Sequence, residues 1–248
     1  MRVGIDIGST AAKAAAFEGD ELVATVVVPT GFNGVEAALR LADELRLIGI
    51  DATACDAHVV ATGYGRISVP YASKTVTEIT CHGRGAAYLF GGDGTVIDVG
   101  GQDTKVIQLA SGKVKKFVMN DKCAAGTGKF LEVIADRMGV TQEQLATLAA
   151  AGETTKISSM CTVFAESEVI SLIGKGEPRE NIANGVIESV VARVASLAGS
   201  IVQSDVFLTG GLCENAYVVT RLAHHLGHPV TTDPRARFAG AIGAALSA

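Results

Sequence analysis

Short apolar runs that each end in a polar, glycine-rich stretch dominate the start of the chain. Residues 2–7 form one such run, which contains Asp6, and a second run contains Asp98. Each copy continues through another apolar segment, a glycine-containing turn and a β-rich segment, which predicts three strands joined by tight turns. Placing Asp6 over Asp98 also aligns Lys13 with Lys105, at an offset of 92 residues. That offset is too long for a solenoid period and indicates a duplicated domain core.

The segments outside the two copies alternate between helical and strand-like patterns. Apolar residues at 35, 38, 39, 41, 42 and 45 recur close to every 3.6 residues, which predicts a helix over Val35–Ile48. Further predicted helices are Cys81–Phe90, Gly128–Met138, Gln142–Ala150, Thr162–Ile173, Asn181–Ser204, Glu214–Leu226 and Ala239–Leu246. Further strands are predicted at His58–Thr62, Asp205–Thr209 and Val230–Thr231. The sum is an α/β fold of two domains, residues 1–94 and 95–248.

Composition narrows the function classes. Hydrophobic residues make up 48% of the 248 residues and charged residues 19%, which is enough apolar material for a packed core. The net charge of −5, without a Lys/Arg run, argues against a nucleic-acid surface. No apolar stretch reaches the ~18 residues of a membrane span. The N-terminus enters a strand without a basic leader, so we expect a cytoplasmic protein.

The glycines gather beside acidic and hydroxyl residues, which indicates backbone that approaches a ligand. In Gly8–Thr10, backbone N–H groups and two hydroxyls can donate to phosphate oxygens, and Lys13 adds positive charge. Asp6 and Asp98 are better suited to hold Mg²⁺ through water, since Mg²⁺ usually keeps several waters in phosphate sites. The residues expected to contact nucleotide here are Gly8, Ser9, Thr10, Ala11, Ala12, Lys13, Gly100, Gly101 and Gln102.

Other segments extend the predicted nucleotide site. Either Gln102 or Asp103 could orient the attacking water. Gly210 and Gly211 end a predicted strand ahead of a helix, where a nucleoside can lie against bare backbone. Candidates for phosphate contact at another helix start are Gly126, Thr127 and Gly128, and candidates to lie near the adenine are Arg235 and Arg237. One such loop is weak support because ordinary β-turns look similar, but two in register favour nucleotide binding.

This combination of loops resembles the superfamily of acetate kinase, sugar kinases, heat-shock chaperones and actin, over the whole chain. The resemblance implies two ribonuclease-H-like (actin-like ATPase) domains around a nucleotide cleft. Superfamily membership leaves kinase, chaperone and filament functions open, because one fold hosts many functions.

The five cysteines, an odd number, are typical of a reducing compartment and argue against a disulfide framework. Cys123 and Cys161 lie just ahead of predicted helices, whose N-termini carry partial positive charge that stabilises thiolates and anionic clusters. Two thiolates cannot complete a four-cysteine iron–sulfur site, but a two-fold dimer supplies four. From spacing alone, buried structural cysteines remain the alternative. Cys55, Cys81 and Cys213 have no partner spacing and are interpreted as structural.

The motifs around these two cysteines are more specific. They are Asn120–Lys129 and Ser158–Glu168, and they are accompanied by Thr77–Gly83 and Phe238–Ala245. Together they resemble the ATP-dependent reductive activators of 2-hydroxyacyl-CoA dehydratases, an ATPase family of the BadF/BadG/BcrA/BcrD type. The resemblance implies a homodimer with one [4Fe-4S] cluster at its interface, ligated by Cys123 and Cys161 of each subunit. It also implies ATP/ADP and Mg²⁺ as ligands, reduced ferredoxin or flavodoxin as electron donor, and an iron–sulfur dehydratase or reductase as acceptor.

Several alternatives stay open at this point. The acceptor can be a 2-hydroxyacyl-CoA dehydratase, a benzoyl-CoA-type reductase or a double-cubane-cluster protein. A sugar kinase of the same fold, or a non-catalytic actin-like or chaperone-like module, would need insertions for which the chain has little room. Glu166 and Glu168 could sense nucleotide, face a partner or simply lie on a helix surface. The histidines are interpreted as a satisfied buried residue, His82, and solvated residues at a helix end, namely His224, His225 and His228.

Overall fold

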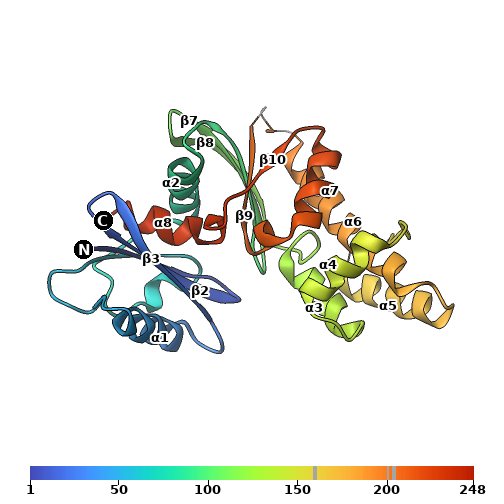
Figure 1. The fold of residues 1–248 in the computed structure, drawn as a ribbon, viewed down its shortest axis with the longest axis horizontal. Helices are drawn as coiled ribbons and strands as arrows, with labels where there is room; N and C mark the ends of the chain where they lie inside the picture. The colour runs from blue at the N-terminus through green and yellow to red at the C-terminus, as the bar shows by residue number, and fades with distance from the viewer. Residues whose placement is uncertain (159–160, 200, 203–204) are drawn as a thin grey trace. The chain divides into compact units, whose positions relative to one another are not determined.

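The computed structural model describes residues 1–158, 161–199, 201–202 and 205–248, and within them it contains two five-stranded sheets with helices packed on them (Figure 1). Ser159 and Met160, in the second cysteine motif, and Ser204, at the end of a predicted helix, lie outside the described residues. The chain forms two compact units. The first contains residues 1–96, 107–117 and 235–248, and the second contains residues 97–106 and 118–234.

The first sheet has the strand order β3-β2-β1-β4-β5. Its strands are β1 (Arg2–Ile7), β2 (Ala11–Glu18), β3 (Glu21–Pro29), β4 (His58–Thr62) and β5 (Lys74–Thr75). β1 pairs antiparallel with β2 and parallel with β4. Because side chains of a strand alternate between faces, β2 contributes to two cores. Ala12, Ala14 and Ala16 join the core under α1 (Gly34–Leu47), whereas Ala15 and Phe17 join the core under α8 (Ala239–Ala245).

Glycines allow α8 to lie directly against backbone. A Cβ on Gly4 of β1 would come within 1.9 Å of the Ala241 carbonyl oxygen. A Cβ on Gly243 would come within 1.8 Å of the Cys81 carbonyl oxygen in α2 (Glu78–Phe90). Both contacts are far shorter than van der Waals distance, so only glycine fits at either position. This explains the small-residue composition of the last helix, and it joins α8 tightly to both β1 and α2.

The second sheet has the strand order β10-β9-β6-β7-β8. Read from β8 to β10, this order repeats that of the first sheet from β3 to β5. Its strands are β6 (Gly94–Val99), β7 (Thr104–Ala110), β8 (Lys113–Asn120), β9 (Val206–Gly210) and β10 (Val230–Thr231). If β6 is matched to β1, every later strand of the second sheet matches its counterpart in order. The duplication predicted from Asp6 and Asp98 is therefore also present in the sheet topology. β10 pairs parallel with β9, as β5 does with β4.

The second unit carries the larger helical layer. Its helices are α3 (Gly128–Arg137), α4 (Gln142–Ala151), α5 (Thr162–Gly174), α6 (Arg179–Ala198) and α7 (Ala216–Leu226). α6 is central and buries many aliphatic side chains, and it packs against both α4 and α7. Short 3₁₀ segments cover Arg66–Ser68, Gly211–Glu214 and Ala236–Phe238.

Most predicted elements are confirmed, and the differences lie at their ends. The helix predicted from Asn181 to Ser204 begins at Arg179 and ends at Ala198. The helix predicted from Glu214 begins at Ala216, because the Asn215 side chain accepts a hydrogen bond from Val218 N at 3.1 Å and fixes the start. The division of the chain at residue 94 stays a prediction. Among the described helices, none is long and apolar enough to cross a bilayer.

Candidate functional site

The loop between β1 and β2 is a tight turn with its hydroxyls exposed. Gly8 N donates to Ala11 O at 3.2 Å and closes the hairpin. The residue that follows β3 supports it, since Thr30 Oγ1 donates to Gly8 O at 2.7 Å and Thr30 N donates to Thr10 O at 3.0 Å. Ser9 and Thr10 remain exposed. The loop is therefore held by its own backbone while its hydroxyls face solvent, as the phosphate-loop prediction requires.

Asp6, at the end of β1, lies in a niche lined by glycine. Its side chain is buried, with the residue only 3% exposed, and its Oδ2 lies 3.9 Å from Lys13 Nζ. A Cβ on Gly63 or on Gly240 would come within 2.5 or 2.6 Å of a carboxylate oxygen of Asp6, so both positions must stay free of a side chain. Asp6 Oδ1 has no hydrogen-bond partner among the described residues. A buried carboxylate oxygen in this state is costly unless a donor or a cation satisfies it.

The second loop closes in the same way, but its charges are internally paired. Gly100 N donates to Asp103 O at 2.9 Å, the counterpart of the Gly8 contact. Lys105 Nζ lies 2.7 Å from Asp103 Oδ2 and 3.5 Å from Asp98 Oδ2, and Lys105 is only 1% exposed. Thr209 Oγ1 of β9 donates to Asp98 Oδ1 at 2.8 Å. The second loop thus contains a buried lysine held between two buried carboxylates.

The two candidates for orienting water differ in exposure. Gln102 is exposed, whereas Asp103 is buried and engaged by Lys105. The geometry therefore favours Gln102 as the residue that can reach a ligand. The catalytic assignment of both residues stays a prediction.

The segment Gly126–Gly128 is bonded to the second loop. Gly128 N donates to Gly100 O at 2.9 Å, and Lys129 N donates to Gly101 O at 2.8 Å. The Thr127 hydroxyl is turned inward and donates to Ala124 O at 2.7 Å. The amides at the start of α3 thus support the second loop, and their direct contact with phosphate stays a prediction.

A cavity of about 770 Å³ opens beside the double glycine at the end of β9. Gly210 has φ +83°, and a Cβ there would come within 2.4 Å of Val99 O, so the turn requires glycine. The cavity is lined by the start of α4, the 3₁₀ segment and the start of α7, including Glu143, Thr147, Gly211, Glu214, Asn215 and Tyr217. This is where the double glycine predicts a nucleoside. The two arginine candidates for the adenine, Arg235 and Arg237, lie in the first compact unit, and their role stays a prediction.

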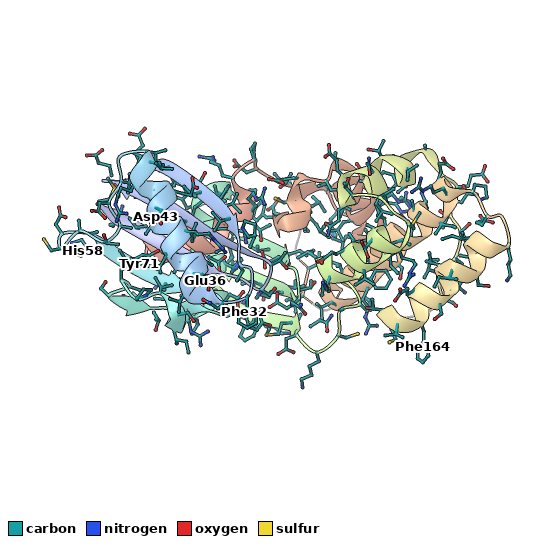
Figure 2. All side chains as sticks on the ribbon, turned by 90° about the horizontal axis from the view of Figure 1, so that it is seen from below. Phe32, Glu36, Asp43, His58, Tyr71 and Phe164 are labelled. Atoms are coloured by element: carbon teal, nitrogen blue, oxygen red, sulfur yellow. The ribbon has the colours of Figure 1, made fainter. Side chains whose placement is uncertain are left out.

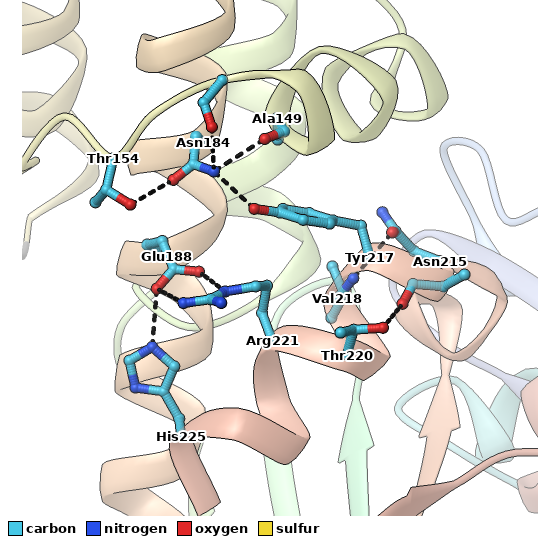
Figure 3. Close-up of polar contacts among 12 residues, drawn as sticks. Ala149, Thr154, Asn184, Glu188, Asn215, Tyr217, Val218, Thr220, Arg221 and His225 are labelled. Atoms are coloured by element: carbon cyan, nitrogen blue, oxygen red, sulfur yellow. Dashed lines mark hydrogen bonds and ion pairs between the residues drawn. The ribbon is translucent and has the colours of Figure 1, made fainter.

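A polar network that no sequence motif predicts supports this cavity (Figure 3). Asn184 of α6, which is 4% exposed, donates from Nδ2 to Tyr217 Oη at 2.6 Å and to Ala149 O at 2.9 Å. Thr154 Oγ1 donates to Asn184 Oδ1 at 3.0 Å. One buried amide therefore joins α4, α6 and α7 around the cavity wall formed by Tyr217. An Asn inside a long apolar helix has no local motif that would reveal this role.

Glu188, one turn further along α6, extends the network. It pairs with Arg221, whose Nη2 lies 3.1 Å from Oε2, and with His225, whose Nε2 lies 2.9 Å from Oε2 (Figure 3). Burial alone would raise the pKa of Glu188, but the hydrogen bonds from Arg221 and His225 lower it below its ordinary value. His225 thus belongs to an ion-pair cluster. Within the described part of the chain, no three His, Cys, Asp or Glu side chains gather into a metal site.

The two motif cysteines are both exposed and both belong to the second unit. Cys123 lies in the loop between β8 and α3, where the Asn120 amide donates to Cys123 O at 2.8 Å and to Ala125 O at 2.9 Å. Cys161 is the N-cap of α5. Both sulfurs are thus free to meet a ligand at the surface, and the helix that follows Cys161 offers its positive end.

The remaining cysteines and His82 have other surroundings. Cys81 and Cys213 are buried as expected, whereas Cys55 is exposed and is not a core residue. Burial raises the pKa of the Cys81 thiol to about 11, so it stays protonated. His82 is also buried, with its Nε2 4.0 Å from Glu78 Oε1.

Comparison with known proteins agrees with this geometry over the full chain. The activator of lactoyl-CoA dehydratase from Anaerotignum propionicum is 45% identical over 253 residues, covering 99% of this chain and 96% of that protein. The crystal structure of component A of the (R)-2-hydroxyglutaryl-CoA dehydratase from Acidaminococcus fermentans matches with a TM-score of 0.94 and 42% identity, covering 100% of this chain and 96% of that one.

A second solved structure is similarly close. The activator of the 2-hydroxyisocaproyl-CoA dehydratase from Clostridium difficile, with bound ADPNP, matches with a TM-score of 0.92 and 38% identity, covering 100% of this chain and 93% of that one. The predicted α/β fold of the actin-like ATPase type is thereby confirmed. The model of one family, described as the BadF/BadG/BcrA/BcrD ATPase family, matches residues 3–248. The chain belongs to the BadF/BadG/BcrA/BcrD ATPase family.

Proposed function

We propose that this ATPase is a reductive activator, which uses ATP hydrolysis to deliver a low-potential electron to a 2-hydroxyacyl-CoA dehydratase or a related reductase. The observation that carries the proposal is the position of Cys123. It is exposed in the loop that leads into α3, and α3 begins with hydrogen bonds to the Gly100–Gly101 loop. Hydrogen bonds and the start of α3 thus connect a candidate electron-transfer ligand to a candidate phosphate loop.

The first loop supports nucleotide binding through its open groups. Ser9 and Thr10 can donate hydroxyls to phosphate, and Lys13 can neutralise its charge. Asp6 fits Mg²⁺, because its Oδ1 is a buried acceptor with no partner among the described residues and a magnesium-bound water would donate to it. The ADPNP bound to the similar Clostridium difficile activator supports the same conclusion. In the second loop, exposed Gln102 is assigned to orient the attacking water.

The cavity beside Gly210 and Gly211 is assigned to the nucleoside. Its volume of about 770 Å³ falls in the range of small-molecule sites. Tyr217 provides an aromatic wall, and Asn184 fixes the orientation of that wall. The base and ribose would therefore bind to a preformed surface of the second unit.

Cys123 and Cys161 fit a [4Fe-4S] cluster shared between two copies of the chain. Both are exposed, which buried Cys81 and Cys213 are not, and one chain offers two such ligands where a cluster of this type takes four. A homodimer supplies the full set. When bound, the cluster would accept one electron from reduced ferredoxin or flavodoxin and donate it to the partner enzyme.

The surface beside Cys161 supports contact with another protein. Val163 and Phe164, in the first turn of α5, are 66% and 68% exposed, and Phe164 projects away from the helix (Figure 2). Large apolar side chains so close to a candidate ligand are typical of a surface that is covered in the working assembly. The dimer proposed here would bring this turn of each chain to the shared cluster.

Anaerobic purification tests the proposal directly. We expect about four irons per dimer and a visible iron–sulfur absorption band, as four-cysteine cluster ligation requires. Both are lost in Cys123→Ala and in Cys161→Ala but kept in Cys55→Ala, the matched control at another exposed cysteine. An iron-free protein that phosphorylates a sugar would overturn the proposal in favour of a kinase of the same fold. Activation of a purified dehydratase, compared with activation of a benzoyl-CoA-type reductase, then separates the partner classes.

A further inference from the structure

The two acidic residues that follow Cys161 each hold a different part of the second unit. Glu166 Oε1 accepts a hydrogen bond from Arg137 Nε at 2.7 Å and a second one from Arg137 Nη2. Glu168 Oε1 accepts from Ser158 N at 3.0 Å and from Ser158 Oγ at 2.9 Å. Arg137 is the last residue of α3, and Ser158 lies three positions before Cys161. Both carboxylates thus reach out of α5 and fix the surroundings of its first turns.

The other end of α3 is joined to the second loop. Gly128 N and Lys129 N, the first two amides of the helix, donate to Gly100 O at 2.9 Å and to Gly101 O at 2.8 Å. At 1.5 Å per residue, the ten residues of α3 form a rod about 15 Å long. One rigid element therefore touches the Gly100–Gly101 loop at its start and α5 at its end.

α5 itself is weakly anchored by apolar contact. Its buried residues are Ala165 and Val169, both small, whereas Ile170 and Ile173 on its outer side are 47% and 48% exposed. A helix with so little buried surface gains a large share of its positional restraint from its polar contacts. The pair of Arg137 with Glu166 is one of those contacts and joins α5 to α3.

We propose that Arg137 and Glu166 are positioning residues that pass a movement of the Gly100–Gly101 loop to Cys161, while Glu168 holds Ser158 in place. This inference rests on the proposed function, in which nucleotide binds near that loop and Cys161 is a cluster ligand. A movement of the loop shifts the start of α3. The other end of α3, which is Arg137, then moves as well and shifts Glu166 and the first turns of α5. Because α3 also follows the Cys123 loop, one nucleotide state biases both cysteines.

The test uses the iron-loaded homodimer and the rate at which a chelator extracts iron, with and without MgATP. MgATP is expected to change this rate by some factor in the parent. We expect Arg137→Ala and Glu166→Ala each to reduce that factor, which is the ratio compared below, by up to about fivefold, since an exposed ion pair contributes up to that much in an equilibrium constant. Iron content and ATP hydrolysis stay at the parent level. The double charge swap, Arg137→Glu with Glu166→Arg, restores most of the ratio.

Glu132→Ala is the matched control. It removes the pair between Lys129 Nζ and Glu132 Oε1, at 2.8 Å, which has comparable exposure and lies on the same helix but does not reach α5. We expect the parent ratio in this variant. An unchanged ratio in both Arg137→Ala and Glu166→Ala, or a charge swap without recovery, overturns the proposal.

A second measurement keeps the inference separate from the proposed function. Amide hydrogen exchange over residues 161–168 is followed in iron-free protein with and without MgATP. We expect ATP to change exchange in the parent and in Glu132→Ala, and to change it less in Glu166→Ala. A parent that binds no iron but shows this pattern refutes the cluster and upholds the positioning role. A parent that binds iron but shows the same ATP response in Glu166→Ala refutes the positioning role alone.

Discussion

The two glycine loops share a sequence pattern and a hairpin geometry but differ in how their charges are paired. In the first copy, Lys13 lies 3.9 Å from Asp6, its side chain is 15% exposed, and one oxygen of Asp6 has no partner among the described residues. In the second copy, Lys105 is 1% exposed and lies within 3.5 Å of two carboxylates. In the first copy, Lys13 and Asp6 leave polar atoms open to a ligand. In the second copy, the aligned residues Lys105 and Asp98 form ion pairs inside the protein.

The difference comes from one position. Asp103 of the second copy aligns with Ala11 of the first, so the second lysine gains a carboxylate partner that the first lacks. The Lys105 ammonium lies 2.7 Å from one carboxylate and 3.5 Å from a second, whereas Lys13 lies 3.9 Å from Asp6. The two lysines align in sequence, but their surroundings differ, which supports the proposed role of Lys13 in ligand binding and gives Lys105 a structural role.

Removal of Lys105 should have the largest effect on stability among the tests of this comparison. Lys105→Met leaves Asp98 and Asp103 buried without their shared cation, and we expect a loss of about 3–5 kcal/mol in the free energy of unfolding. Urea unfolding followed by circular dichroism measures it. Lys13→Met, the same change in the first copy, should cost less, because Lys13 lies 3.9 Å from a single carboxylate and its side chain is 15% exposed. Equal losses in the two variants would contradict the assignment.

Activity should show the opposite order. Lys13→Met removes a cation from the open loop, and we expect ATP hydrolysis to fall by at least about 100-fold, equivalent to roughly 2.7 kcal/mol of transition-state stabilisation. Iron content should stay at the parent level, because Cys123 and Cys161 lie in the other compact unit. Steady-state phosphate release and an iron assay measure the two properties. Hydrolysis at the parent rate would remove Lys13 from the phosphate site.

Much of the fold could be predicted, because its signals are local. The repeat of Asp6 and Lys13 at Asp98 and Lys105 indicated the duplication, and the matching strand orders bear it out. Helix ends were less predictable, since they depend on caps such as Asn215, whose contact forms only when the chain is folded. The close approach of Gly4 to α8 joins the two ends of the sequence and has no local signal.

The candidate site divides in the same way. Glycines, acidic strand ends and cysteines before helices carry chemistry in their residue types, so the sequence alone makes them candidates. Asn184 and Arg137 act through partners far away in the chain, Tyr217 and Glu166, and nothing in their own neighbourhood marks them. The burial of Lys105 likewise depends on tertiary packing, which the alignment with Lys13 does not reveal.

The two copies also differ in the hydrogen bond made by a threonine on matching strands, Thr209 in the second copy and Thr62 in the first. Its hydroxyl donates to Asp98 and is fully buried, whereas Thr62, at the end of the matching strand β4, donates to Val76 O at 2.9 Å. Thr209→Val should therefore cost about 2 kcal/mol in the free energy of unfolding, because it removes a donor from a buried charge. Thr62→Val, which removes a donor from a neutral carbonyl, should cost about 1 kcal/mol. Urea unfolding of the two variants measures both losses, and the reverse order would argue that Asp98 is satisfied without Thr209.

The smallest expected difference concerns the hairpin turns and pH. Asp93 accepts hydrogen bonds from Ser111 N at 2.8 Å and Gly112 N at 3.0 Å in the second copy, whereas Arg2 binds the Gly19–Asp20 turn of the first copy. The bonds from Gly112 and Ser111 lower the pKa of Asp93 below its ordinary value. A lowered folded-state pKa means that the stabilisation is fully present above the unfolded value of about 3.9 and is lost as pH falls through the folded value. Asp93→Asn should therefore be less stable than the parent at pH 6, and the gap should narrow as pH falls toward 3. Thermal unfolding at a series of pH values measures the gap, and a gap that stays constant would show that this turn gains its stability from shape alone.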